Sequence, residues 1–312
     1  MKAVVTGCAG FVGSHLTEAL LAGGLRVTGI DSFTDYYRPQ AKRQNLEQAL
    51  RHGDFELLEA DILRLAEFPE TDYLFHLAAQ PGVRASWGTS FEVYVRNNVL
   101  ATQKLLEYYK DRRLARFVYA SSSSVYGDCP DLPMREDSLL KPVSPYGVTK
   151  LAAENLCYLY YKNYGLPAVS LRYFTVYGPR QRPDMAINKM VGAVFAGDEI
   201  TVFGDGTQTR DFTYVEDAVE ATVIAAQKGP PGEVFNTGGG SRITVNELVG
   251  KIESIAGRKA RVRNTEEQKG DVRDTLADIS KAGQILNWQP EVGIDRGLER
   301  YIAWFHSTAQ TQ

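Results

Sequence analysis

The sequence predicts an α/β protein with a doubly wound parallel sheet and a smaller C-terminal domain, and three observations support this prediction. Short runs of β-branched residues alternate with helix-length apolar patterns over the first two thirds of the 312 residues. A glycine-rich segment directly follows the first of these runs. The composition, 44% hydrophobic and 23% charged, is that of a globular chain long enough for one large or two moderate domains.

The strands and helices of the first part are assigned in order from their patterns. Helices are expected where apolar residues recur at helical spacing, over residues 11–22, 97–109 and 146–164. Strands are expected where β-branched and aromatic residues cluster, over residues 3–6, 26–30, 55–59, 73–77, 117–120 and 168–172. Right-handed crossovers would bring the carboxyl ends of these strands to one edge of the sheet, where ligands bind.

The alternation stops after Arg172, which places a domain boundary near residue 175. Gly178-Pro179 and Arg182-Pro183 predict turns, and a helix is expected over residues 187–196. Further short strands are expected at 200–203 and 234–235. The first domain then covers residues 1–175 and the second covers 176–312, with later segments able to return to the sheet.

Charge and cysteine usage exclude several classes of function. Lys and Arg total 35 against 38 Asp and Glu, so we expect no nucleic-acid partner. No apolar stretch reaches the ~18 residues of a membrane span, so we expect no membrane partner. The three cysteines and four histidines are scattered, which predicts neither a disulfide framework nor a metal site. A cytoplasmic, reducing environment follows as the expected location.

A dinucleotide-binding pattern, Thr6-Gly7-Cys8-Ala9-Gly10-Phe11-Val12-Gly13, joins the first strand to the first helix. Gly7 permits a tight turn, Gly10 lets a pyrophosphate approach the backbone, and Gly13 allows close packing of helix and strand. Asp31 ends the second strand, where a carboxylate accepts hydrogen bonds from the ribose hydroxyls of NAD and repels the extra phosphate of NADP. The pattern therefore predicts a Rossmann-type domain that binds NAD.

Three residues predict oxidation chemistry at an alcohol. Tyr146 and Lys150 lie four residues apart, on one helix face, and Ser122 ends a neighbouring strand. A phenol has an ordinary pKa of ~10, and we expect the Lys150 ammonium and a positive nicotinamide ring to lower the pKa of Tyr146. The three side chains would then remove a proton from an alcohol while hydride leaves its carbon.

On these residues the chain resembles the extended short-chain dehydrogenase/reductase family, specifically its NAD-dependent sugar-nucleotide epimerases. The resemblance covers nearly the whole chain and extends to His76-Leu77-Ala78-Ala79, Gly204-Asp205-Gly206, Arg210-Asp211-Phe212 and Gly270-Asp271. It implies an NAD-binding domain, a UDP-sugar-binding domain and a set of cofactor contacts. These contacts are Gly7, Gly10, Phe11, Val12, Gly13, Asp31, Asp61, Ile62, Leu77, Ala78, Ala79, Tyr146, Lys150 and Tyr173.

The resemblance also implies roles for individual side chains. Tyr146 would be the base, Lys150 would hold the ribose and tune the phenol, and Ser122 would assist. Arg210 and Arg273 would grip the nucleotide diphosphate, with Asn188 as an amide contact. One departure is Gln268, where some relatives carry Arg, so the grip on the ribose and phosphate differs in detail.

The reaction type depends on the two residues before Val125. Related dehydratases place an acidic pair there and decarboxylases place a Glu, whereas this chain has Ser123 and Ser124. Without a carboxyl group, elimination of water has no acid/base partner. The pattern therefore favours a 4-epimerase over a dehydratase, with a non-catalytic NAD-binding sensor as the other class of function.

Three segments resemble the branch of the family that acts on UDP-glucuronate and UDP-galacturonate. They are residues 31–37, 79–84 and 173–186. A sugar carboxylate needs a cation or several donors, which Arg84, Arg182, Thr175, Ser123 and Ser124 would supply, unless Arg84 contacts the cofactor phosphates. The alternatives are a UDP-glucose/UDP-galactose or N-acetyl 4-epimerase and a UDP-glucuronate decarboxylase.

The resemblance further implies a homodimer formed through two helices. The apolar stretches Tyr94 to Tyr109 and Leu151 to Tyr164 are the segments expected to make that bundle.

Overall fold

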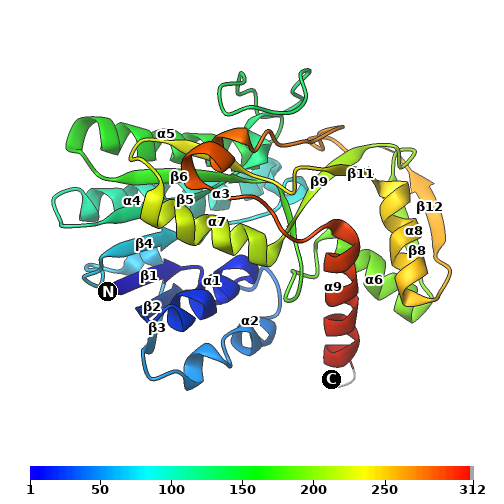
Figure 1. The fold of residues 1–312 in the computed structure, drawn as a ribbon, viewed down its shortest axis with the longest axis horizontal. Helices are drawn as coiled ribbons and strands as arrows, with labels where there is room; N and C mark the ends of the chain where they lie inside the picture. Colours follow the sequence, from blue (N-terminus) through cyan, green and yellow to red (C-terminus); the bar gives the residue numbers. More distant parts are fainter. Residues whose placement is uncertain (267, 310–312) are drawn as a thin grey trace.

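A seven-stranded parallel sheet organises the computed structural model, which describes residues 1–266 and 268–309 (Figure 1). The strand order is β10-β6-β5-β4-β1-β2-β3. The strands are β1 (Lys2–Thr6), β2 (Arg26–Asp31), β3 (Phe55–Glu59), β4 (Tyr73–His76), β5 (Arg116–Ser122), β6 (Ala168–Tyr173) and β10 (Val234–Thr237). The predicted fold class is confirmed.

Helices cover both faces of this sheet and enclose two cores. On one face α1 (Phe11–Ala22) packs against α7 (Val215–Lys228), and on the other α4 (Ala101–Tyr109) packs against α5 (Pro145–Tyr164). Successive residues of a strand point to opposite faces. Val5 and Val118 therefore lie in the first core, whereas Val4 and Phe117 lie in the second.

The helix expected over residues 97–109 differs from the prediction. It begins earlier, as α3 (Phe91–Tyr94), continues through the π-helical segment η5 (Val95–Leu100), and only then becomes α4. Asn98 in η5 donates from Nδ2 to Thr149 Oγ1 of α5 at 3.0 Å and to the carbonyl oxygen of Gln80 at 3.1 Å. The wide turn, which apolar periodicity does not reveal, thus accompanies a buried contact between the two helices.

The C-terminal part lies beside the sheet, at the right of Figure 1. It contains the helices α6 (Ala186–Ala196), α8 (Val245–Ala256) and α9 (Ile294–Ala309). Its strands form two small sheets: β7 (Thr175–Tyr177), β9 (Thr209–Tyr214) and β11 (Arg242–Thr244) in one, and β8 (Glu199–Phe203) and β12 (Arg261–Thr265) in the other. The intervening α7 and β10 return to the large sheet.

Short helical elements complete the described chain. They are α2 (Pro39–Asn45), η1 (Ala49–Arg51), η2 (Ile62–Arg64), η3 (Arg84–Ser86), η4 (Gly88–Ser90), η6 (Ser123–Val125) and η7 (Ala282–Leu286). Within the described residues, no helix has the length and apolar character needed to cross a membrane.

Candidate active site

The turn between β1 and α1 forms a cradle that admits no side chain at its key positions. Gly7 has φ +72°, and a Cβ there would lie 2.8 Å from the backbone nitrogen of Ala78. A Cβ on Gly13 would collide with the carbonyl oxygen of Gly7. Gly10 precedes the first residue of α1 and provides no side-chain cap. The first backbone amides of the helix are therefore available to bind an anion. Residues 77–79 follow β4 directly beside this turn.

Asp31 lies at the edge of the same cradle. Its carboxylate accepts from the backbone nitrogens of Ala9 at 3.1 Å and Phe33 at 2.8 Å, and burial raises its pKa. The nearby Tyr37 hydroxyl is buried without a hydrogen-bond partner. Asp61 accepts from the backbone nitrogen of Leu63 at 2.9 Å and from Arg96 at 3.0 Å, and Ile62 is buried beside it. The unpartnered Tyr37 hydroxyl and the Asp31 carboxylate, which can accept further hydrogen bonds, suit a ligand with ribose hydroxyls.

Ser122, Tyr146 and Lys150 meet at the carboxyl end of β5. Ser122 Oγ accepts from the backbone nitrogen of Ser124 at 3.1 Å and forms a hydrogen bond with the Tyr146 side chain. Lys150 Nζ donates to the carbonyl oxygen of Ala120 at 2.6 Å. Burial lowers the pKa of Lys150 to about 8. The structure thus brings together the three residues that the sequence singled out for chemistry.

The sequence analysis expects a lowered pKa for Tyr146, whereas the side chains of the protein alone give a raised one. Burial raises the pKa of Tyr146, while its hydrogen bond with Ser122 and the charge of Arg182 act in the opposite direction. Lys150 Nζ is held on the Ala120 carbonyl. Desolvation of a phenolate therefore outweighs the partners that the sequence could name.

Arg182 lies near Tyr146, in the loop after β7, and its charge is already paired. Its Nε and Nη2 atoms donate to the two Asp184 carboxylate oxygens at 2.9 and 3.0 Å, and the Tyr36 hydroxyl donates to Asp184 at 3.2 Å. Thr175 begins β7, and Ser123 and Ser124 form η6. The sequence did not identify Tyr36 as a partner, because it lies 148 residues from Asp184, and it did not identify Asp184, although this residue is only two positions from Arg182.

Arg84 lies beside Asp271 and Phe203, and its charge reaches Arg210. It pairs with Asp271 at 2.5 Å, its guanidinium carbon is 4.1 Å from the Phe203 ring centroid, and its charge acts on Arg210. No signal in the sequence pointed to Phe203. The Arg84–Asp271 pair joins the loop after β4 to the C-terminal part.

The other residues predicted to contact the nucleotide or the cofactor are held by hydrogen bonds or ion pairs within the chain. Arg210 Nη1 donates to the carbonyl oxygens of Thr209 at 2.9 Å and Arg273 at 2.8 Å, and burial lowers its pKa. Arg273 is exposed, with its Nε 3.7 Å from Asp274. Asn188 of α6 donates to the carbonyl oxygen of Gln181 at 3.1 Å. Tyr173, at the end of β6, shares a 2.6 Å hydrogen bond with Thr222.

The described residues contain no group of three or more His, Cys, Asp or Glu side chains that could hold a metal ion.

Comparison with known proteins agrees with this geometry. The model of the NAD dependent epimerase/dehydratase family matches residues 3–238. A Bacillus subtilis (strain 168) protein named uncharacterized UDP-glucose epimerase YtcB is 45% identical over 99% of each chain. The UDP-glucuronate 4-epimerase of Thermodesulfobacterium geofontis (strain OPF15) is 41% identical over 96% of this chain and 95% of its own. The crystal structure of the Bacillus cereus UDP-glucuronic acid 4-epimerase with UDP-glucuronic acid and NAD superimposes with a TM-score of 0.95, at 42% identity over 99% of this chain and 100% of that one.

Proposed function

The chain belongs to the NAD dependent epimerase/dehydratase family, and from this premise we propose that it interconverts UDP-glucuronate and UDP-galacturonate through a 4-keto intermediate. The observation that carries the proposal is the meeting of Ser122, Tyr146 and Lys150 beside the glycine cradle. A buried base next to a dinucleotide cradle suits oxidation of a secondary alcohol.

The residues around the cradle fit NAD. Gly10 leaves the backbone open to its pyrophosphate, and Gly7 and Gly13 allow the tight turn and close helix packing around it. Asp31 and the unpartnered Tyr37 hydroxyl lie where we propose that a ribose binds. When bound, NAD supplies an acceptor for the hydride of carbon 4 and a donor that returns it. We assign NAD binding to residues 1–175 and UDP-sugar binding to residues 176–312. Within the second segment, β10 nevertheless completes the large sheet and α7 packs against it.

Tyr146 removes the proton from the 4-hydroxyl of the sugar. Ser122, which lies beside Tyr146, forms a hydrogen bond with the same sugar oxygen and so orients it. Burial alone would keep the phenol protonated, so ionisation depends on the positive charges around it. Arg182 supplies one such charge. Lys150 supplies another when its ammonium approaches the cofactor ribose and the phenol.

Epimerisation requires no further acid or base once the 4-keto sugar has formed. The sugar must turn over and receive hydride on its other face. Ser123 and Ser124 offer hydroxyls where elimination would need a carboxyl group, so they hold the substrate without protonating a leaving group. This feature separates the proposed reaction from dehydration.

The carboxylate of a uronate needs secure contacts, because a 4-ketone is β to the carboxyl group at carbon 5. Such an acid loses carbon dioxide when the bond to the carboxyl group stands perpendicular to the carbonyl plane. Thr175, Ser123 and Ser124 are the neutral donors proposed to hold the carboxylate out of that alignment. Arg182 shares its charge with Asp184, so it contributes its remaining N–H donors rather than a free cation.

The nucleotide is held at the mouth of the site. Arg210, Arg273 and Asn188 are the proposed contacts of the diphosphate and its ribose, since Arg pairs well with phosphate oxygens. Arg84 joins this group, because its position over Phe203 and near Arg210 places it on the nucleotide side.

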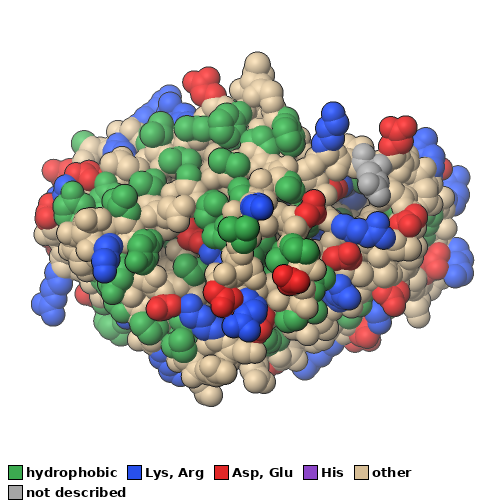
Figure 2. Space-filling model, turned by 90° about the horizontal axis from the view of Figure 1, so that it is seen from above, with side chains coloured by type: hydrophobic (Ala, Val, Ile, Leu, Met, Phe, Trp, Pro, Cys, Tyr) green, Lys and Arg blue, Asp and Glu red, His purple; other side chains and the backbone are tan. Residues whose placement is uncertain are grey.

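We also propose a cytoplasmic homodimer. Figure 2 looks onto the side of the molecule where α5 lies in Figure 1, and apolar side chains gather over its left and central part. Exposed apolar residues on the two segments expected to form the dimer include Leu100, Tyr158, Leu159 and Tyr164. Light scattering should give twice the chain mass, and Leu159→Arg should halve it; a monomeric wild type would contradict the proposal.

The free thiols of Cys8, Cys129 and Cys157 suit a reducing compartment.

The substrate is tested by incubating the purified protein with a panel of UDP-sugars and resolving the products by NMR. UDP-glucuronate should give UDP-galacturonate faster than UDP-glucose gives UDP-galactose. Faster turnover of UDP-glucose or an N-acetyl sugar would assign the neutral-sugar alternative, a UDP-pentose product would assign the decarboxylase, and no turnover would leave the NAD-binding sensor. Nucleotide released on denaturation should be NAD rather than NADP.

A further inference from the structure

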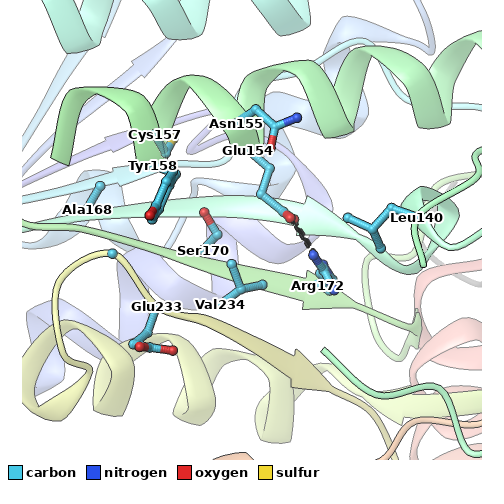
Figure 3. Close-up of a pocket in the computed structure, with 11 residues that line it drawn as sticks. Leu140, Glu154, Asn155, Cys157, Tyr158, Ala168, Ser170, Arg172, Glu233 and Val234 are labelled. Carbon is cyan, nitrogen blue, oxygen red and sulfur yellow. Dashed lines mark hydrogen bonds and ion pairs between the residues drawn. The ribbon is translucent and has the colours of Figure 1, made fainter. Parts of the chain in front are cut away.

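Glu154 is a buried carboxylate one helical turn beyond Lys150, and the roles above do not use it. It is 5% exposed, and its Oε2 accepts from Ser121 Oγ at 2.6 Å. On its other side it meets Arg172 of β6, whose Nη2 lies 2.6 Å from Oε1 and whose Nε lies 3.1 Å from Oε2. Figure 3 shows Glu154 reaching from α5 toward Arg172.

This contact is the third of a regular series between α5 and the end of β5. Three α5 residues spaced four apart are held by three consecutive residues of the strand. Tyr146 bonds with the Ser122 side chain, Lys150 donates to the Ala120 carbonyl, and Glu154 accepts from Ser121. Glu154 therefore fixes the helix that carries the base to the strand that carries the assisting serine.

Arg172 holds the carboxylate in place from the opposite side. Its Nη1 donates to the Tyr126 hydroxyl at 2.8 Å and to the carbonyl oxygen of Glu136 at 3.0 Å. Tyr126 in turn donates to Asn236 Oδ1 at 2.7 Å. Because every member of this chain has partners, the Glu154 charge stays at one position relative to Lys150.

We propose that Glu154 is a positioning residue that keeps the Lys150 ammonium charged and α5 aligned with Ser122 during the reaction. This inference rests on the proposed epimerase function. An amide would still accept from Ser121, but it would leave the buried Arg172 guanidinium without an anion, so the double variant described below is needed to separate the effect on Lys150 from the loss of the Arg172 pair. A buried ammonium without a nearby anion readily loses its proton.

The charged and titratable groups around Lys150 support this assignment. Glu154 and Cys157 face it from α5, Tyr119 from β5 and His76 from β4. Burial lowers the pKa of Lys150 and the pKa of His76, and burial raises the pKa values of Cys157 and Tyr119. Cys157, Tyr119 and His76 are therefore uncharged near neutral pH, which leaves Glu154 as the anion among these groups.

The test is the pH profile of kcat/KM for UDP-glucuronate with the NAD-loaded enzyme. In Glu154→Gln the alkaline limb, where the Lys150 ammonium is lost, should move down by roughly one pH unit. KM should stay within about twofold, because Glu154 lies behind the catalytic residues and not in the mouth of the site. An unchanged alkaline limb would overturn the proposal.

Two matched variants separate charge from structure. Glu154→Gln with Arg172→Gln removes both members of the pair, which should recover folding stability and leave the alkaline limb at the lowered position. Tyr126→Phe cuts the same hydrogen-bond chain but retains the Glu154 charge, so it should reduce stability and leave the limb as in the wild type. An alkaline limb that shifts in Tyr126→Phe, or that returns to the wild-type position in the double variant, would contradict the positioning role.

A cavity of about 190 Å³ next to the pair allows a chemical rescue. Its walls include Glu154, Arg172 and Ser170 (Figure 3). Formate added to Glu154→Ala should restore the wild-type alkaline limb in a saturable manner, whereas neutral formamide should not. Equal effects of the two compounds, or none from formate, would count against a charge effect.

These readouts distinguish the inference from the proposed function. If the wild type does not epimerise any UDP-sugar, the proposed function fails. If the wild type epimerises UDP-glucuronate and the Glu154 variants keep its pH profile, the positioning role alone fails.

Discussion

The two walls of the site are built in different ways. The proposed catalytic wall consists of Ser122, Tyr146 and Lys150 on a strand end and a helix, with their polar atoms held by neighbouring elements. The proposed nucleotide and sugar wall includes two arginines, in η3 and in the loop after β7, that pair with carboxylates of the same chain. Arg182 binds Asp184, and Arg84 binds Asp271.

This difference separates a preassembled part from a part that must exchange partners. In the proposed mechanism Ser122 and Tyr146 keep their contacts, and only the Lys150 ammonium shifts from the Ala120 carbonyl toward the cofactor ribose and the phenol. An arginine already paired with a carboxylate has to share or change its partner before it can bind a diphosphate or a uronate. We therefore expect changes in the first wall to affect the chemical step and changes in the second wall to affect substrate preference and affinity.

The largest effect is expected from Tyr146→Phe. Loss of a positioned acid/base should lower kcat by ~10²–10⁴-fold, while NAD and UDP-glucuronate still bind. Steady-state rates together with calorimetric binding measure both quantities. Near-normal turnover would remove Tyr146 from the proposed role and with it the distinction between the two walls.

Arg182→Ala should have an intermediate effect that depends on the sugar. Loss of one charge-assisted contact costs ~1.5–3 kcal/mol, so kcat/KM for UDP-glucuronate should fall by about tenfold or more. Turnover of UDP-glucose, measured in parallel, should change little. Equal losses for both sugars would show that Arg182 acts on Tyr146 instead of on the carboxylate.

Arg84→Ala should have a smaller effect that does not depend on the sugar. The Arg84 side chain is 47% exposed, so we discount its contribution and expect about three- to tenfold weaker binding of both UDP and UDP-glucuronate. Titration calorimetry with the two ligands checks this. A loss confined to UDP-glucuronate would return Arg84 to the sugar wall.

The smallest effect on turnover is expected from His76→Gln, which tests the buried support of the catalytic wall. His76 lies between Thr6 and Thr102, at 2.7 and 2.9 Å, and burial lowers its pKa to about 3. The unfolded chain binds a proton below pH ~6.5 while the folded protein does not, so stability falls as the pH drops from 6.5 toward 3. At pH 5 this proton costs roughly 2 kcal/mol.

Denaturant unfolding at pH 7 and pH 5 measures this dependence. The variant should lose less stability between the two pH values than the wild type does. An equal loss in both proteins would mean that His76 is not the group responsible.

The same contrast explains how much could be predicted from the sequence. The α1 helix and β3 match their predicted bounds, and Tyr146 and Lys150 were found because four-residue spacing on a helix is visible in a single segment. The hydrogen bond between Tyr36 and Asp184 spans 148 residues and the Arg84–Asp271 pair spans 187. No local pattern encodes such pairings, so Arg84 was found without Asp271. The Arg182–Asp184 pair, only two residues apart, could have been read locally but was not.

The C-terminal helices show a different kind of omission. A capping box joins Thr244 and Glu247 at the start of α8, and this spacing is readable in the sequence. The prediction stopped short of it because the strand–helix alternation had already broken. The π-helical turn at Asn98, by contrast, has no sequence signal in the apolar pattern.

The most direct test follows the hydrogen on carbon 4. UDP-glucuronate carrying deuterium at carbon 4 is incubated with the enzyme in ordinary water, and the product is examined by NMR and mass spectrometry. Reversible oxidation within a closed site predicts UDP-galacturonate that retains deuterium at carbon 4, with no UDP-pentose. Loss of the deuterium to solvent, or a UDP-pentose as the main product, would contradict the proposed mechanism.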